Sequence, residues 1–132
     1  MINVYVDGSF SPVTGEGSYG MIIQREGKTI KIGGPLGQIK DNNVAEYGAM
    51  VRGFQELKKM GLHNEIIKIH TDSQVLYRQL LKHIPPPVQK EHSKWYSHAA
   101  SLFKSFSRCV IDFIYSSCNP AHDVAKQALN SK

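Results

Sequence analysis

The order of strand-like and helix-like patterns most strongly constrains the fold of this 132-residue chain. Three strand-like stretches come first, and the remainder alternates between helical and strand-like patterns. Gly27 supplies a turn between the second and third strands. This order predicts an α/β fold with one mixed sheet flanked by helices, in a single domain over residues 1–132. The predicted strands are 2–7, two within 18–34, 65–71 and 109–117, and the predicted helices are 43–60, 73–84, 95–106 and 122–132.

Charge and cysteine content narrow the function classes without choosing one. Sixteen lysines and arginines against eleven aspartates and glutamates give a net charge of +5, which permits a polyanionic partner but does not require one. No apolar run approaches the roughly 18 residues of a membrane span, and the first residues do not resemble a signal peptide, so we expect no membrane partner. Cys109 and Cys118 flank a predicted strand and would lie ~30 Å apart, which favours a reduced, cytoplasmic protein and leaves only a bridge between molecules open.

Four acidic residues stand at the ends of predicted elements. A right-handed crossover through the 43–60 helix would place the fourth strand beside the first and parallel to it. Asp7 and Asp72 would then be neighbours at the carboxyl edge of the sheet, where open α/β sheets bind ligands. Glu46 lies in the first turn of the crossover helix, whose small residues Ala49 and Gly53 allow close packing on the sheet. With Asp123 at the start of the last helix, all four acids are expected at one edge.

Each acid also has a purely structural interpretation. Asp72 and Asp123 suit the N-cap of a helix, Glu46 suits the positive end of a helix dipole, and Asp7 suits a turn. These interpretations weaken when the acids share an edge, because clustered anions repel one another and raise each other's pKa unless a cation is present. The sequence therefore favours a divalent metal site.

Four ordered blocks of sequence resemble the type 1 ribonuclease H family. They are VYVDGSF with GEGSYG, NNVAEYGAM, IHTDSQ and NPAHDVAKQAL, and together they cover essentially the whole chain. The resemblance implies a ribonuclease H-like sheet with strand order 3-2-1-4-5, in which only the second strand is antiparallel to the others. It also implies a metal-dependent endonuclease, a monomer, that hydrolyses the RNA strand of RNA/DNA hybrids and leaves 5′-phosphate ends.

The same resemblance assigns site residues. It implies two Mg²⁺ or Mn²⁺ ions, with Asp7 bridging them, Glu46 and Asp72 completing one shell and Asp123 the other. Substrate contacts are implied for Gly8, Ser9, Asn42, Asn43 and Gln74, although Gly8 could be only a turn residue and the asparagines only helix caps.

Several departures from the family pattern leave other functions open. The histidine that many members carry about ten residues before the last aspartate is missing, and His70 and His122 are the nearby alternatives. His122 adjoins Asp123 but points about 100° away from it, so it is not a simple substitute, and His70 is more typical of a histidine packed on the sheet. The segment before Trp95 is too short for the family's basic protrusion, and Val13 replaces a phosphate-binding asparagine. A weakly active binding module, or a related nuclease with another substrate, therefore remains an alternative.

Overall fold

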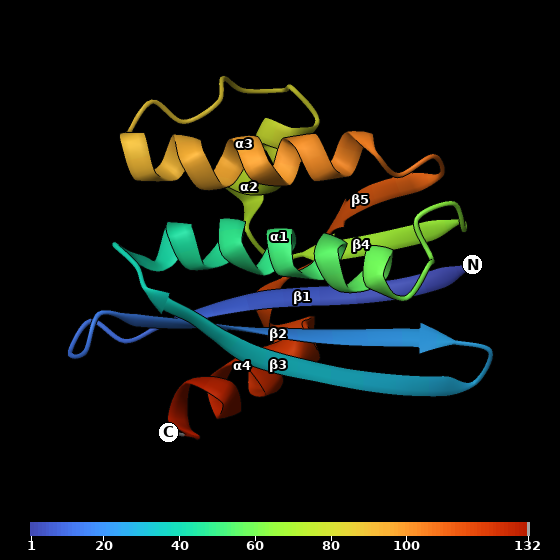
Figure 1. Ribbon diagram of the computed structural model, residues 1–132, viewed down its shortest axis with the longest axis horizontal. Helices are drawn as coiled ribbons and strands as arrows, with labels where there is room; N and C mark the ends of the chain where they lie inside the picture. The colour runs from blue at the N-terminus through green and yellow to red at the C-terminus, as the bar shows by residue number, and fades with distance from the viewer. Residues whose placement is uncertain (132) are drawn as a thin grey trace.

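The computed structural model describes residues 1–131, which form one five-stranded sheet with helices on both faces (Figure 1). The strand order is β3-β2-β1-β4-β5, as predicted. β2 runs antiparallel to β1 and β3, while β1, β4 and β5 are mutually parallel, so only the second strand is reversed. The elements are β1 (Ile2–Phe10), β2 (Glu16–Arg25), β3 (Lys28–Gln38), α1 (Asn42–Lys59), β4 (Ile67–Thr71), α2 (Gln74–Leu80), α3 (Lys90–Lys104), β5 (Cys109–Phe113), a short 3-10 helix (Ser116–Cys118) and α4 (Ala121–Asn130).

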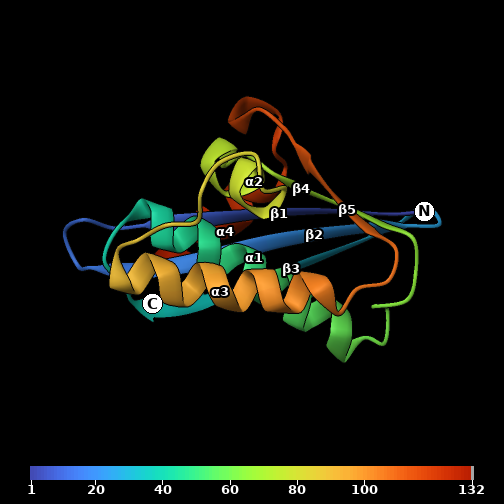
Figure 2. The same ribbon diagram turned by 90° about the horizontal axis from the view of Figure 1, so that it is seen from above.

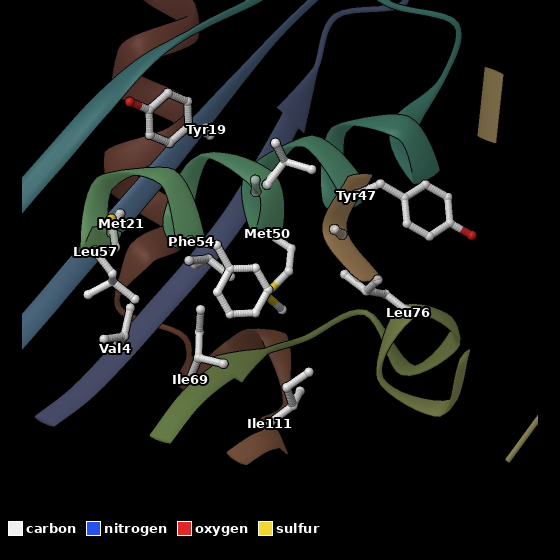
Figure 3. Close-up of a cluster of buried hydrophobic side chains, with 14 of the residues drawn as sticks. Val4, Tyr19, Met21, Tyr47, Met50, Phe54, Leu57, Ile69, Leu76 and Ile111 are labelled. Carbon is white, nitrogen blue, oxygen red and sulfur yellow. The ribbon is translucent and has the colours of Figure 1, made fainter. Parts of the chain in front are cut away.

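The main core lies between α1 and the sheet. Alternate β1 residues, Val4 and Val6, are buried and face α1, and the helix turns Met50 and Phe54 towards them. Figure 3 shows Met50 and Phe54 of the helix gathered with Val4 of β1 and Ile69 of β4. Removing side chains of this size from water contributes roughly 1.5–3 kcal/mol each to stability. This burial holds α1 close to the centre of the sheet.

α3 and α2 complete the layer around α1. Phe54 of α1 packs between Phe103 and Phe106, with ring centroids 5.9 and 4.9 Å apart respectively. Figure 2 shows α3 alongside α1, with α2 next to β4 and β5. No helix of residues 1–131 has the length and apolar character needed to cross a membrane.

α4 covers the opposite face of the sheet. Gly20 of β2 lies directly under it, because a side chain there would overlap the backbone nitrogen of Ala125. Ala121 and Ala125 are fully buried, and the Ser18 hydroxyl donates a hydrogen bond of 2.6 Å to the Ala125 carbonyl. The small residues bring helix and strand into backbone contact, which fixes both the height and the rotation of α4.

Several predicted boundaries were wrong. β1 continues to Phe10 because it pairs with β2 through that residue. The fifth strand ends at Phe113 instead of 117, because its partner β4 ends at Thr71 and leaves nothing to pair with. α2 stops at Leu80 where residue 84 was predicted, and Lys82 then adopts a left-handed conformation with φ of 63°.

The helix boundaries near the predicted site also differ. α3 starts earlier than predicted and ends before Phe106. α1 begins at Asn42, so Glu46 lies one turn inside the helix and not in its first turn. α4 begins at Ala121, which makes Asp123 its third residue and not its cap. Lys132, the last residue of the predicted terminal helix, lies outside the described residues. The turn at Gly27 is confirmed, since Glu26 and Gly27 have φ of 50° and 76° and link a two-residue hairpin.

Candidate metal centre

Three of the four predicted acids meet at the carboxyl edge of the parallel strands. The parallel pairing of β1 with β4 ends at Tyr5 and His70, and Asp7 and Asp72 each lie two residues further along. Glu46 joins them from α1, and one carboxylate oxygen from each residue lies within 4.8 Å of the others. Only 4% of the Asp7 surface is exposed. The sheet edge and the crossover helix therefore build a compact, half-buried acidic cluster.

Gly8 allows Glu46 to reach this cluster. Asp7 lies on the α4 face of the sheet, whereas Glu46 comes from α1 on the other face, so the glutamate must pass close to β1. The Gly8 N–H donates a hydrogen bond of 2.8 Å to Glu46 Oε1. A side chain on Gly8 would overlap the Ala45 carbonyl. Gly8 is thus a strand residue required for close helix contact, and its interpretation as a turn residue was wrong.

We expect Gly8→Ala to displace α1 and loosen the site. The added methyl group has no room against helix backbone, and overpacking of this kind typically costs about 1–3 kcal/mol. The unfolding free energy should fall by that amount in chemical denaturation, and binding of Mn²⁺ should weaken because Glu46 moves. Gly33→Ala is the matched control, because its nearest neighbours would be side-chain atoms of Ala128 and Val124 at 3.3 Å and the Val124 carbonyl oxygen at 3.4 Å, which leave the room for a methyl group that is missing at Gly8. Equal losses in the two variants would contradict this role of Gly8.

Burial and mutual repulsion disfavour the charged forms of the clustered carboxylates, and no lysine or arginine of the described residues offsets this. Burial raises the pKa of Asp7 to about 6, and the nearby Asp72 carboxylate adds to this, against hydrogen bonds with Glu46 and His122 that lower it. Burial likewise raises the pKa of Glu46 well above its usual value, helped by its hydrogen bond to Asp72 and by the charge of Asp7. Within residues 1–131, no lysine or arginine forms an ion pair with these carboxylates. A hard divalent cation with oxygen ligands fits this donor set.

The fourth predicted acid lies apart from the other three. Asp123 is exposed on the first turn of α4 and does not belong to the cluster of carboxylate oxygens. Its neighbour His122 instead approaches the site, with Nδ1 at 3.0 Å from Asp7 Oδ2. α4 therefore presents an imidazole to the cluster at the place where an acid was predicted.

Asn119 anchors this end of α4 and was not anticipated from the sequence. Its Nδ2 donates to the Val6 carbonyl at 3.0 Å and to Asp72 Oδ2 at 3.2 Å, and its Oδ1 accepts from the Ala121 N–H at 3.0 Å. The side chain is 5% exposed. One amide thus joins the start of α4 to β1 and to the carboxylate that follows β4. An asparagine just before a predicted helix was the available signal, but its tertiary partners are far away in sequence.

The helix-cap interpretations are wrong for Asp72 and for the two asparagines. Ser73 caps α2, accepting a hydrogen bond from the Leu76 N–H at 3.2 Å. Asp41 caps α1, accepting from Val44 N at 3.0 Å. Asn42 and Asn43 are therefore not the caps of α1 and lie exposed in its first turn. Among the predicted substrate contacts, Asn42, Asn43 and Gln74 are exposed, whereas Gly8 and Ser9 are half-buried in β1.

His70 lies on the sheet face and does not belong to the group of potential metal ligands formed by Asp7, Glu46 and Asp72. Its ring stacks on Tyr5 with centroids 4.4 Å apart, and its nitrogens lie 3.4 Å from Asn3 Oδ1 and 3.6 Å from Asp112 Oδ2. Burial lowers the pKa of His70, which favours the neutral ring. These contacts describe a histidine packed on the sheet.

The sheet order and the helices of this chain form a ribonuclease H-type fold. Solved structures share the architecture: ribonuclease H1 from the halophilic archaeon Halobacterium salinarum matches with a TM-score of 0.87 and 22% identity, over 99% of this chain and 98% of that one. LC11 ribonuclease H1 in complex with an RNA/DNA hybrid matches with a TM-score of 0.84 and 23% identity, over 99% of this chain and 98% of that one. The resemblance drawn from the four sequence blocks is thereby confirmed.

A comparison of the sequence with models of protein families identifies the family. Residues 5–128 match the model of the reverse transcriptase-like family, and the chain belongs to that family. Among curated proteins, the uncharacterized protein YpeP of Bacillus subtilis is 28% identical over 114 residues, which cover 79% of this chain and 47% of YpeP. The match thus spans about half the length of this curated relative.

Proposed function

We propose that this protein is a metal-dependent endonuclease that hydrolyses the RNA strand of RNA/DNA hybrids. The observation that carries the proposal is the cluster of Asp7, Glu46 and Asp72 at the carboxyl edge of a ribonuclease H-type sheet. The family match supports it, as does the hybrid bound to the similar LC11 ribonuclease H1. The substrate is then recognised by its backbone and shape, because no base-reading element is needed to distinguish A-like geometry.

The cluster suits two Mg²⁺ or Mn²⁺ ions. When bound, such ions activate a water molecule for attack and offset the charge that develops on the phosphate and the leaving oxygen. Asp7, Glu46 and Asp72 would hold them, and the Gly8 N–H orients Glu46 for this purpose. The first turn of α4 would supply a further ligand. The sequence motif indicates Asp123 for this role, although its carboxylate lies outside the cluster.

The exposed polar residues around the cluster supply the proposed substrate contacts. Asn42 and Asn43 would reach the minor groove from the start of α1, and Gln74 from the start of α2. Gly8 and Ser9 would contact the RNA strand beside the cluster. We further propose that residues 1–132 act as a single monomeric domain. The free Cys109 and Cys118 suit a reduced, cytoplasmic setting.

A panel of labelled substrates tests the proposal. RNA/DNA hybrid, double-stranded RNA and single-stranded RNA are incubated with the protein in Mg²⁺, in Mn²⁺ and in EDTA. We expect internal cuts in the hybrid's RNA strand with either metal and none in EDTA. Cleavage that prefers single-stranded RNA would favour a related nuclease with another substrate, and no cleavage of any substrate would favour the binding module.

The short connection between α2 and α3 favours weak substrate binding. It is also the feature that favours the alternative function, a binding module with little activity. Residues 81–89 contain the three prolines Pro85 to Pro87 and form no helix or strand. Lys40 lies next to this connection, where its Nζ is 3.1 Å from Gln89 Oε1. Trp95 packs against the core, so its ring is not presented on an extended basic arm.

We therefore expect a shallow salt dependence of hybrid binding. Each neutralised phosphate contributes about −0.9 to the slope of log K against log salt concentration. Few organised cations should give a slope no steeper than about −4, measured by fluorescence anisotropy with an uncleaved hybrid in Ca²⁺ or EDTA. A slope of about −7 or steeper would reveal a basic surface that this account does not include.

A further inference from the structure

The first turn of α4 places the imidazole of His122 beside the acidic cluster, whereas the sequence motif assigns Asp123 to this position. We propose that His122, and not Asp123, is the α4 ligand of the metal centre. The inference rests on the proposed function, because it concerns the same ions. His122 Nδ1 lies 3.0 Å from Asp7 Oδ2, while Asp123 is exposed outside the cluster. The His122 side chain is 57% exposed, so both solvent and an ion can reach it.

The rotation of α4 is fixed by its buried face. Ala121 and Ala125 are fully buried, and the backbone at Ala125 lies against Gly20. Successive helix residues are rotated by about 100°, so His122 lies at the flank of this face and Asp123 about 200° from Ala121. Turning Asp123 towards Asp7 would lift the alanines off β2. The Ser18 hydroxyl, bonded to the Ala125 carbonyl, opposes the same rotation.

The position of α4 along its axis is fixed at its N-terminal end. Asn119 hydrogen-bonds to the Val6 carbonyl, to Asp72 and to the Ala121 N–H. These contacts place the residue that follows Ala121 directly beside Asp7. The Asn119 side chain therefore holds His122 at the cluster, and no rearrangement of the helix is needed to present it.

The separation of the two side chains suits shared coordination. In an octahedral site with ligand distances of about 2.1 Å, adjacent ligand atoms are about 3.0 Å apart. This is the separation of His122 Nδ1 and Asp7 Oδ2. A neutral imidazole nitrogen is a weaker ligand for Mg²⁺ than a carboxylate, whereas transition metals accept it well. With three acids and one imidazole, the centre should prefer Mn²⁺ over Mg²⁺ more strongly than four acids would.

Pulsed electron paramagnetic resonance of bound Mn²⁺ tests the assignment directly. An imidazole nitrogen coordinated to Mn²⁺ gives a ¹⁴N modulation that carboxylates do not. We expect this modulation in the wild type and in Asp123→Asn, and its loss in His122→Asp. Titration should show Mn²⁺ binding unchanged in Asp123→Asn and weakened more than about tenfold in His122→Ala. His122→Asp should bind both metals, with the preference shifted towards Mg²⁺.

Two results would overturn the assignment. One is Mn²⁺ bound at the cluster of the wild type without ¹⁴N modulation, and the other is weakened Mn²⁺ binding in Asp123→Asn but not in His122→Ala. Asp72→Asn identifies the site, since ions at the cluster must be lost in that variant. If wild type and Asp72→Asn bind Mn²⁺ equally, the metal centre and the proposed function fail together. If Mn²⁺ binds and hybrid is cleaved without the nitrogen signal, only the assignment of His122 fails.

Discussion

Replacing Asp7 with asparagine is expected to raise the stability of the metal-free protein at pH 7 by about 1–3 kcal/mol. The Asp7 carboxyl is buried beside Asp72, and its pKa is raised from 3.8 to about 6. The folded state therefore binds a proton more tightly than the unfolded state. Because the charged form is disfavoured in the fold, the unfolding free energy should fall as pH rises from about 4 to 6 and stay lower above that. Asparagine has a similar shape and no charge, so the unfolding free energy of the variant should fall much less over this pH range.

Chemical denaturation of EDTA-treated protein between pH 4 and 8 measures this effect. Glu26→Gln is the matched control, because Glu26 is an exposed carboxylate in the turn between β2 and β3, far in the chain from the cluster and in no ion pair among the described residues. We expect the control to follow the wild-type pH profile. Parallel profiles for wild type and Asp7→Asn would show that Asp7 is not a strained anion in the folded protein.

Asp72→Asn should abolish most of the stabilisation that Mn²⁺ gives to the wild type. An ion that binds only the folded state stabilises it by RT ln(1 + [L]/Kd), about 2.7 kcal/mol at one hundred times Kd. Asp72 is one of three carboxylates whose oxygens lie within 4.8 Å of one another, so losing its charge removes a ligand. The apo variant should be as stable as the wild type or more so, because repulsion falls. The quantity to compare is the increase in Tm on adding Mn²⁺.

Ser73→Ala provides the control for this experiment. Ser73 is the residue that caps α2, so its removal should cost about 1 kcal/mol of stability. The Mn²⁺-dependent increase in Tm should remain, because Ser73 is not a ligand. The two neighbouring variants thus separate helix capping from metal binding. Equal Mn²⁺ increments in wild type and Asp72→Asn would remove Asp72 from the metal centre.

The topology could be predicted because it depends on patterns that are local in sequence. Period-two strands, period-3.6 helices and the single crossover helix place β4 beside β1, and the sequence blocks resembling ribonuclease H supply the rest of the strand order. The meeting of Asp7 and Asp72 follows directly, since both stand just beyond the same parallel pairing. Small residues at Ala49 and Gly53 correctly indicated the close approach of α1 to the sheet.

The first turn of α4 could not be predicted in the same way. The sequence predicts a helix from residue 122 with Asp123 at its start, but the structure starts the helix one residue earlier, at Ala121, and buries Ala121 and Ala125. A shift of one residue rotates a helical side chain by about 100°, so this small boundary error decides whether an aspartate or a histidine faces the cluster. The contacts that set the boundary, from Asn119 to Val6 and Asp72, join residues more than 45 positions apart.

The most direct test of the central claim is cleavage of an RNA/DNA hybrid by wild type and by Asp7→Asn, purified in parallel. The RNA strand carries a 5′ label, the reaction contains Mn²⁺, and the new ends are mapped chemically. The account predicts internal cuts in the RNA strand alone, with 5′-phosphate ends, for the wild type and none for Asp7→Asn. Cleavage at the same rate in both preparations, or no cleavage by either, would contradict a metal-dependent ribonuclease built on this acidic cluster.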